Sequence, residues 1–176
     1  MKASIYILAI SAALVLSSSS LVNTDNWKIG NGYFVKFSTK NASGEFKTLK
    51  GDIVFDENNL EKSYFNVALD VESIQTGIGL KNKHARSEKW FDAAAYPEIK
   101  FVSEKISRVN NGFEVTGKLD MHGVIRQIII PFTFSNNLFS GSFTVNRLDY
   151  KVGADRGFSA TVGNEIKISV SVPVEK

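Results

Sequence analysis

Few side chains in this sequence have the type and spacing that catalysis requires. The 176 residues contain no cysteine and two histidines, His84 and His122, so a thiol nucleophile is excluded, and the histidines lack metal-ligand spacing. Ser87, His84 and Asp92 have the side chains of a hydrolytic triad, but on one short predicted helix they would not converge on one substrate atom. We therefore predict no catalytic site, no metal site and no cofactor, and we interpret His84 as a helix-surface or capping residue.

Arg147 is the charged residue whose position most requires a partner. It continues the alternation of Phe143 and Val145 and so falls on an apolar face, with Asp149 on the same side. Burying a guanidinium without a partner is very unfavourable. The pattern favours an internal ion pair with Asp149 or Asp92, and direct contact with a ligand is the alternative.

The composition is that of a globular protein of about one domain. Hydrophobic residues make up 43% and charged residues 22% of the chain, which excludes a disordered or low-complexity class. The net charge is +3, and basic and acidic residues are interspersed along the sequence. We therefore predict no nucleic-acid partner.

The first twenty residues have the order of a secretory signal. Lys2 precedes an apolar run from Ile5 to Leu16, and four serines follow at 17–20. The run is shorter than the roughly 20 residues that span a bilayer. We expect a cleaved signal peptide at 1–20, one folded domain at 21–176, and a periplasmic or secreted location. Without disulfides, such a domain must be held together by its core.

After the signal, apolar and polar residues alternate with a period of two, which is typical of antiparallel strands with one buried face. Asn111-Gly112 and Asn136-Asn137 are predicted turns between such strands. The predicted strands are about eight in number and cover 33–37, 51–55, 65–71, 99–108, 115–121, 128–134, 139–145 and 166–174.

The segment from Leu80 to Tyr96 breaks this period and is rich in helix formers, so we predict a short helix over residues 81–92. One helix with about eight antiparallel strands indicates an all-β fold, either an up-and-down barrel or a two-sheet sandwich. The 13 phenylalanines would then fill a closed core or line a cavity, because an eight-stranded barrel is just wide enough for either.

Two segments after the predicted strands of the first half carry recognisable motifs: His84 to Asp92 read H-A-R-S-E-K-W-F-D, and Tyr96 to Ser103 read Y-P-E-I-K-F-V-S. They resemble the signature H-L-R-S-x-D-F-F-D and Y-P-x-I-x-F-x-S of the YceI-like, polyisoprenoid-binding proteins. Further similar elements lie at 44–56, 73–76, 117–124 and 146–153, in the family's order. The sequence departs from the family at Ala85, Trp90 and Lys81-Asn82, close to the expected mouth of the barrel.

The resemblance implies a lipocalin-like antiparallel barrel, exported to the periplasm, whose apolar channel accepts an isoprenoid lipid such as a quinone or prenyl carrier. The polar end of the ligand is expected at His84, Arg86 and Arg147. The side chains predicted to line the channel are Tyr33, Val35, Phe37, Ile53, Phe55, Phe65, Val67, Leu69, Phe101, Leu119, Phe132, Phe143 and Val145.

Binding of a long apolar ligand is the leading functional prediction, because burial of methylene groups needs few polar contacts. One alternative is an enzyme that acts on an isoprenoid or a stress metabolite and uses His84 with Asp92 or Arg147. Another is a closed-core barrel that serves as a protein interaction module. The sequence leaves the oligomeric state open, and a dimer is compatible with it.

Overall fold

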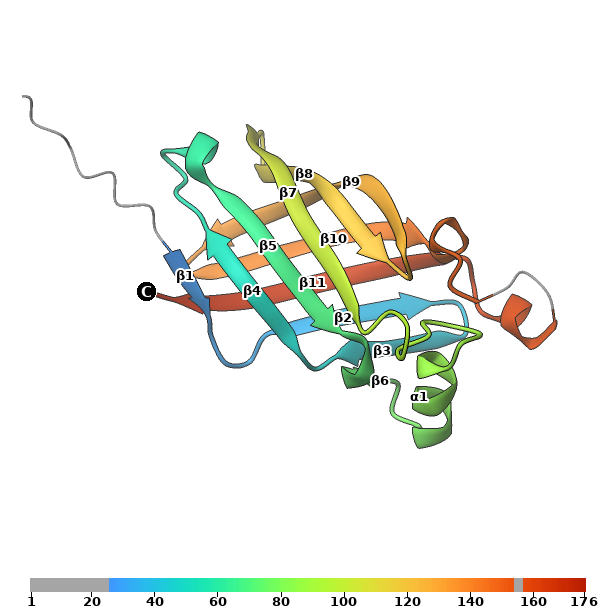
Figure 1. Ribbon diagram of the computed structural model, residues 1–176. Helices are drawn as coiled ribbons and strands as arrows, with labels where there is room; N and C mark the ends of the chain where they lie inside the picture. Colours follow the sequence, from blue (N-terminus) through green and yellow to red (C-terminus); the bar gives the residue numbers. More distant parts are fainter. Residues whose placement is uncertain (1–25, 154–156) are drawn as a thin grey trace, which may run out of the picture.

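The computed structural model describes residues 26–153 and 157–176, in which eight strands form a closed antiparallel β-barrel (Figure 1). The predicted all-β barrel with one short helix is confirmed. The expected signal peptide at 1–20 lies outside the described residues. The strands of the ring, in their spatial order, are β1 (Asn26–Ile29), β4 (Leu49–Val54), β5 (Tyr64–Asp70), β7 (Glu98–Val109), β8 (Gly112–Met121), β9 (Val124–Ser135), β10 (Leu138–Asn146) and β11 (Glu165–Glu175).

The short strand β1 closes the ring. On one side Trp27 pairs with Ile53 of β4, and on the other Ile29 pairs with Val174 of β11. The Trp27 indole Nε1–H also donates a hydrogen bond to the Phe55 carbonyl at 2.8 Å. Closure removes the exposed sheet edges that would otherwise pair with other chains.

Three more strands extend the sheet at one end of the barrel. The hairpin of β2 (Phe34–Thr39) and β3 (Ala42–Phe46) pairs with the other half of β11, and β6 (Ile74–Gln75) pairs with β3. The helix α1 (Gly79–Arg86) lies beside β6, with the β2–β3 turn at the same end of the molecule (Figure 1). Short 3₁₀ helices cover Leu60–Lys62, Val71–Ser73, Arg147–Tyr150 and Gly157–Thr161.

The helix is shorter than predicted and begins earlier. It ends at Arg86 because Ser87 has extended backbone and its hydroxyl donates to the His84 carbonyl at 2.7 Å. Asp92 has a positive φ of 45°, which no helix residue adopts, so the predicted end at Asp92 is wrong. Turns carry the chain from Ser87 to β7, with the Asp92 carbonyl accepting from the amides of Ala95 and Tyr96.

Two-residue turns join the long strands, as the sequence indicates. Asn136 and Asn137 both have positive φ, which matches the twist of a tight hairpin. The turn between β7 and β8 lies one residue earlier than predicted, because Gly112 already pairs with Val109. Gly112 has a φ of 136° and its Cα lies close to the Phe132 carbonyl of β9, which leaves no space for a side chain.

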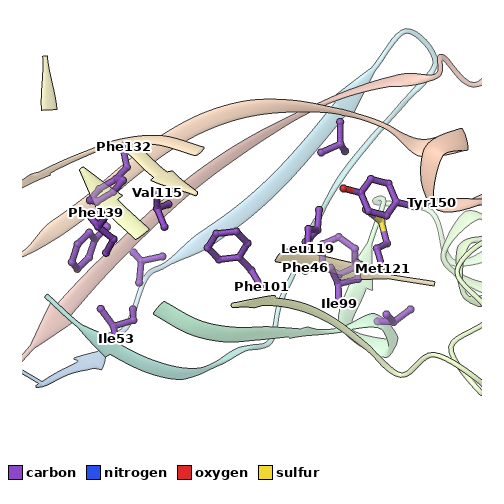
Figure 2. Packing of buried hydrophobic residues seen from close by; sticks show 14 of the residues in the cluster. Phe46, Ile53, Ile99, Phe101, Val115, Leu119, Met121, Phe132, Phe139 and Tyr150 are labelled. Carbon is purple, nitrogen blue, oxygen red and sulfur yellow. The ribbon is translucent and has the colours of Figure 1, made fainter. Parts of the chain in front are cut away.

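Alternate residues of the strands point into the barrel, and buried apolar side chains lie along its interior (Figure 2). At the end closed by β1, six aromatic rings pack together around Phe55, which meets its neighbours edge to face and lies 5.1 Å from both Phe113 and Phe134. We call this group the aromatic plug; it consists of Trp27, Phe55, Phe113, Phe132, Phe134 and Phe139. Towards α1 the interior is not filled.

Among the described residues, no helix combines the length and apolar character needed to cross a membrane.

Candidate functional site

A cavity of about 940 Å³ occupies the barrel between the aromatic plug and α1. This is near the upper end of the roughly 300–1,000 Å³ that is typical of ligand pockets. Its wall is mainly aliphatic and aromatic, with Phe101 at mid-height and Phe132 and Phe139 at the closed end (Figure 2). The solvent-exposed residues of its wall lie on or just before α1, around the β2–β3 turn and at Thr161, and we call this end of the cavity the mouth.

Eleven of the thirteen predicted channel residues belong to the wall of this cavity. Phe55 lies instead within the aromatic plug, with 1% of its surface exposed. Tyr33 is also absent from the wall, and its hydroxyl binds the connection between β3 and β4: it donates to the Lys47 carbonyl at 2.8 Å and accepts from the Leu49 amide at 3.1 Å. Contact of the eleven with a ligand stays a prediction.

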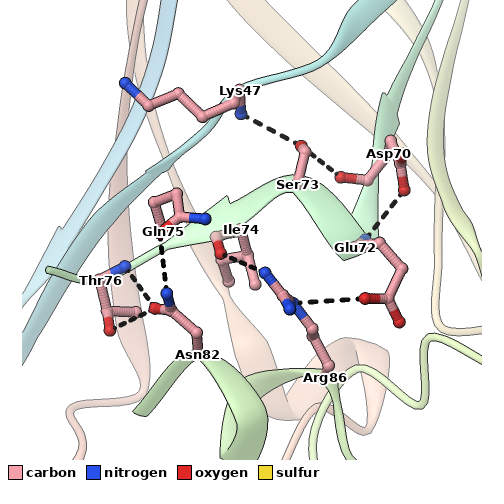
Figure 3. Close-up of polar contacts among 9 residues, drawn as sticks. All are labelled: Lys47, Asp70, Glu72, Ser73, Ile74, Gln75, Thr76, Asn82 and Arg86. Atoms are coloured by element: carbon pink, nitrogen blue, oxygen red, sulfur yellow. Dashed lines mark hydrogen bonds and ion pairs between the residues drawn. The ribbon is translucent and has the colours of Figure 1, made fainter. Parts of the chain in front are cut away.

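The three residues predicted for the polar end have different surroundings. His84 and Arg147 both line the cavity. Arg86 does not, because its guanidinium points to β6, donates to the Ile74 carbonyl at 3.1 Å and forms an ion pair with Glu72 at 3.5 Å (Figure 3). Arg86 therefore attaches α1 to the barrel, and the prediction that it lies at the ligand's polar end does not fit its position.

Arg147 is buried, with 3% of its surface exposed, as the alternation predicts. The predicted ion pair is wrong, however: neither Asp149 nor Asp92 pairs with Arg147, because a 3₁₀ helix begins at Arg147 and the strand alternation stops there, leaving Asp149 exposed. The guanidinium donates instead to carbonyl oxygens of Val152, Ser159, Val162 and Gly163 at 2.9–3.3 Å and to Asn164 Oδ1 at 2.8 Å.

These hydrogen bonds place the Arg147 side chain in the middle of one side of the mouth. The guanidinium carbon lies 5.5 Å from the centre of the Trp90 ring, within the range of a cation–π contact. Gly153 has a φ of 69°, and a Cβ there would lie 2.9 Å from both Arg147 Nη1 and Trp90 Cζ3. Only glycine therefore allows the chain to pass this close to the stacked pair.

The sequence places Lys81 and Trp90 close to the expected mouth, but it identifies neither these two nor Lys40, Leu80 and Phe91 as lining residues. Lys40 lies in the β2–β3 turn, Lys81 and Leu80 on α1, and Trp90 and Phe91 on the turn after it, and all five line the cavity. They belong to segments without a period of two, so alternation gives no signal for them. The described wall contains Lys40, Lys81, His84 and Arg147 but no carboxylate.

The side chains of a hydrolytic triad are present but not arranged as one. The Ser87 hydroxyl donates to the main-chain carbonyl of His84, and no hydrogen bond joins the His84 ring to Ser87 or Asp92. His122 lies in the turn between β8 and β9, with a positive φ and its Nδ1 3.2 Å from the Tyr150 carbonyl. Within 26–153 and 157–176, no group of three histidine or acidic side chains is placed to hold a metal ion.

Tyr150 is nearly fully buried beside the cavity, and burial raises the pKa of its phenol above the ordinary value. The native state therefore keeps the phenolic proton to higher pH than the unfolded chain, so we expect the free energy of unfolding to fall as the pH rises above about 10. In an absorbance titration at 295 nm, Tyr150→Phe should remove the phenol that ionises last. If the variant instead loses a phenol that ionises at lower pH, the assignment of the raised pKa to Tyr150 is contradicted.

Comparisons with known proteins agree with this architecture. The model of the YceI-like domain matches residues 20–174. Protein YceI of Escherichia coli is 30% identical over 92% of each chain. The crystal structure of Burkholderia cenocepacia BcnA is similar over 82% of this chain and 96% of its own, with a TM-score of 0.76 and 27% identity.

A polyisoprenoid binding domain from Saccharophagus degradans has the same fold at lower similarity. Its TM-score is 0.59 at 16% identity, over 85% of this chain and 97% of that one. The family match spans nearly the whole described barrel, including the mouth and the aromatic plug. The chain therefore belongs to the YceI-like family.

Proposed function

We propose that this chain is an exported binding protein that sequesters or carries a polyisoprenoid lipid, such as a quinone or a prenyl carrier, in the barrel cavity. The observation that carries the proposal is the cavity itself, which is apolar along its length, closed by the aromatic plug and open at α1. Each methylene group moved from water into such an interior contributes about 0.8 kcal/mol. A long hydrocarbon chain can therefore be held with few polar contacts.

The positions of the charged side chains in the cavity wall indicate how a bound lipid would be oriented. Its apolar tail would lie towards Phe132 and Phe139, where the wall has no charged group, and its head group at the mouth. Because Lys40 and Lys81 line the mouth, the head group is expected to be negatively charged or rich in hydrogen-bond acceptors.

Two further points support this proposal. The structural neighbour from Saccharophagus degradans is a polyisoprenoid binding domain with the same fold. The unfilled interior also argues against the closed-core alternative, because a barrel that served only as an interaction module would be expected to pack its core to normal density. Export is proposed on the order of residues within 1–20 alone.

The two tryptophans provide a test, because Trp90 lines the cavity and Trp27 lies in the aromatic plug. In delipidated protein carrying Trp27→Phe, addition of a long-chain polyprenyl alcohol should change the emission of Trp90 in a saturable manner. The matched variant Trp90→Phe, which keeps only Trp27, should respond much less. Geraniol, with a short chain, should bind far more weakly. The absence of a saturable response in the Trp27→Phe protein would contradict lipid binding.

A further inference from the structure

The helix α1 presents apolar side chains to solvent beside the mouth. Leu80 is 64% exposed and Ile78, just before the helix, is 51% exposed, although both also line the cavity. Large apolar side chains that are grouped at the rim of an apolar cavity mark an interaction site more strongly than single exposed ones. The cavity wall thus continues outward onto the surface through these two residues.

The opposite side of the helix is attached to the barrel (Figure 3). The Asn82 side chain accepts from the Thr76 amide at 2.7 Å and donates to Gln75 Oε1 at 2.8 Å, while Arg86 donates to the Ile74 carbonyl. Residues four apart share a helix face, and residues two apart lie on nearly opposite faces. Leu80 and His84 therefore lie on the helix face opposite Asn82 and Arg86, where they are exposed at the rim of the cavity.

The exposed face of α1 is basic. Lys81 and Lys83 lie on either side of Leu80 and His84, and the helix sequence contains no acidic residue. Lys40 of the β2–β3 turn adds a further cation at the mouth. Apolar side chains surrounded by lysines are the combination with which proteins bind the interface of an anionic bilayer.

We propose that the surface formed by Ile78, Leu80, Lys81, Lys83 and His84, which we call the docking face, binds the surface of an anionic lipid bilayer. Ile78 and Leu80 insert among the lipid chains while Lys81 and Lys83 contact anionic head groups. The inference rests on the proposed function, because docking would connect the bilayer interior with the cavity through a continuous apolar path. A lipid could then move between them without crossing water.

The small apolar area favours a bilayer over a protein partner. A stable protein interface buries more than about 1,000 Å² with a well-packed apolar centre, whereas the docking face offers two apolar side chains among cations. Interfacial binding to lipid needs only such a small inserted group combined with electrostatic attraction. A second copy of this chain is also disfavoured, because it would bring the same lysines together.

Vesicle sedimentation tests the docking face with the full mature protein. The protein should bind vesicles of phosphatidylcholine with phosphatidylglycerol, bind pure phosphatidylcholine far less, and dissociate at high salt. Leu80→Ser, and separately Lys81→Glu with Lys83→Glu, should each lower the partition coefficient about tenfold. The controls Ile129→Ser and Lys105→Glu change exposed residues of the barrel wall and should bind as the unmodified protein does.

Two outcomes would overturn the docking face. One is failure of the unmodified protein to bind phosphatidylglycerol vesicles, and the other is equal binding by the docking-face variants and the controls. A dimer seen by light scattering that Leu80→Ser dissociates would assign the face to a second copy and equally overturn the proposal. Melting temperatures equal to that of the unmodified protein would show that the variants fold, since all the changed side chains are exposed.

The same preparations separate this inference from the proposed function. Lipid bound to the purified protein is measured alongside vesicle binding. Protein that carries lipid but does not bind vesicles would overturn the docking face and leave the proposed function intact. Protein that binds vesicles through Leu80 and Lys81 but neither carries nor takes up a polyprenyl lipid would overturn the proposed function and support membrane docking on its own.

Discussion

Replacing Val67 with tryptophan should reduce lipid retention at least about tenfold, a loss of roughly 1.4 kcal/mol in binding free energy. Val67 lies on β5 at mid-height of the barrel, lines the cavity and pairs with Phe101 of β7. An indole at this position would occupy the space between the mouth and the closed end of the cavity. The hydrocarbon chain of a long lipid could then not extend past residue 67, while a short ligand near the mouth could still bind.

The control for this blockade is Asn66→Trp, one residue earlier on the same strand. Asn66 is exposed on the outside of the barrel, so the larger side chain should leave lipid retention unchanged. Overpacking at Val67 is itself expected to cost about 1–3 kcal/mol of stability, so circular dichroism and a thermal melt must show that the variant is folded. Full retention of a long-chain lipid by folded Val67→Trp protein would show that the ligand does not pass this point.

Arg147→Met should lower the free energy of unfolding of the lipid-free protein by about 3–5 kcal/mol. Methionine has a similar length but no donors, so the carbonyls of Val152, Ser159, Val162 and Gly163 would lose the guanidinium that they now share. Unsatisfied buried acceptors cost about 1–3 kcal/mol each. The segments at the mouth that accept hydrogen bonds from Arg147 would be the first part of the protein to lose their structure.

Arg108→Met provides the matched comparison for this prediction. Arg108 donates to the Glu57 carbonyl at 2.8 Å and lies over the Phe113 ring, but its side chain is 57% exposed. We expect its loss to change stability by less than about 1 kcal/mol. A melting temperature of lipid-free Arg147→Met protein within a degree or two of the unmodified protein would instead indicate that Arg147 acts mainly on the ligand.

The barrel walls could be predicted from the sequence because each long strand has one buried face. In β8, for example, the alternate residues Phe113, Val115, Gly117, Leu119 and Met121 are buried and the residues between them are not. Alternation reports whether a side chain points inward, but not how deep it lies along the barrel axis. This is why Phe55, although inward, lies in the aromatic plug rather than in the cavity wall.

The mouth could not be predicted in the same way, because it is built from helix, turns and long-range contacts. The alternation predicts that Arg147 is buried, but the described hydrogen-bond acceptors of its guanidinium lie 5–17 residues further along the chain and are mostly main-chain carbonyls, which no side-chain pattern shows. The end of α1 depends on the extended backbone of Ser87 and on its side-chain hydrogen bond to the His84 carbonyl. The cavity itself exists because inward side chains leave space, a property of their packing and not of their periodicity.

The most direct test of lipid binding is extraction of the purified protein with organic solvent, followed by mass spectrometry. We expect an isoprenoid lipid in an amount approaching one molecule per protein chain, and far less from Val67→Trp protein purified in parallel. The comparison distinguishes a lipid held in the cavity from host lipid that adheres to the surface. Extracts without isoprenoid lipid, or with equal amounts from both proteins, would contradict the proposal that the cavity is the lipid site.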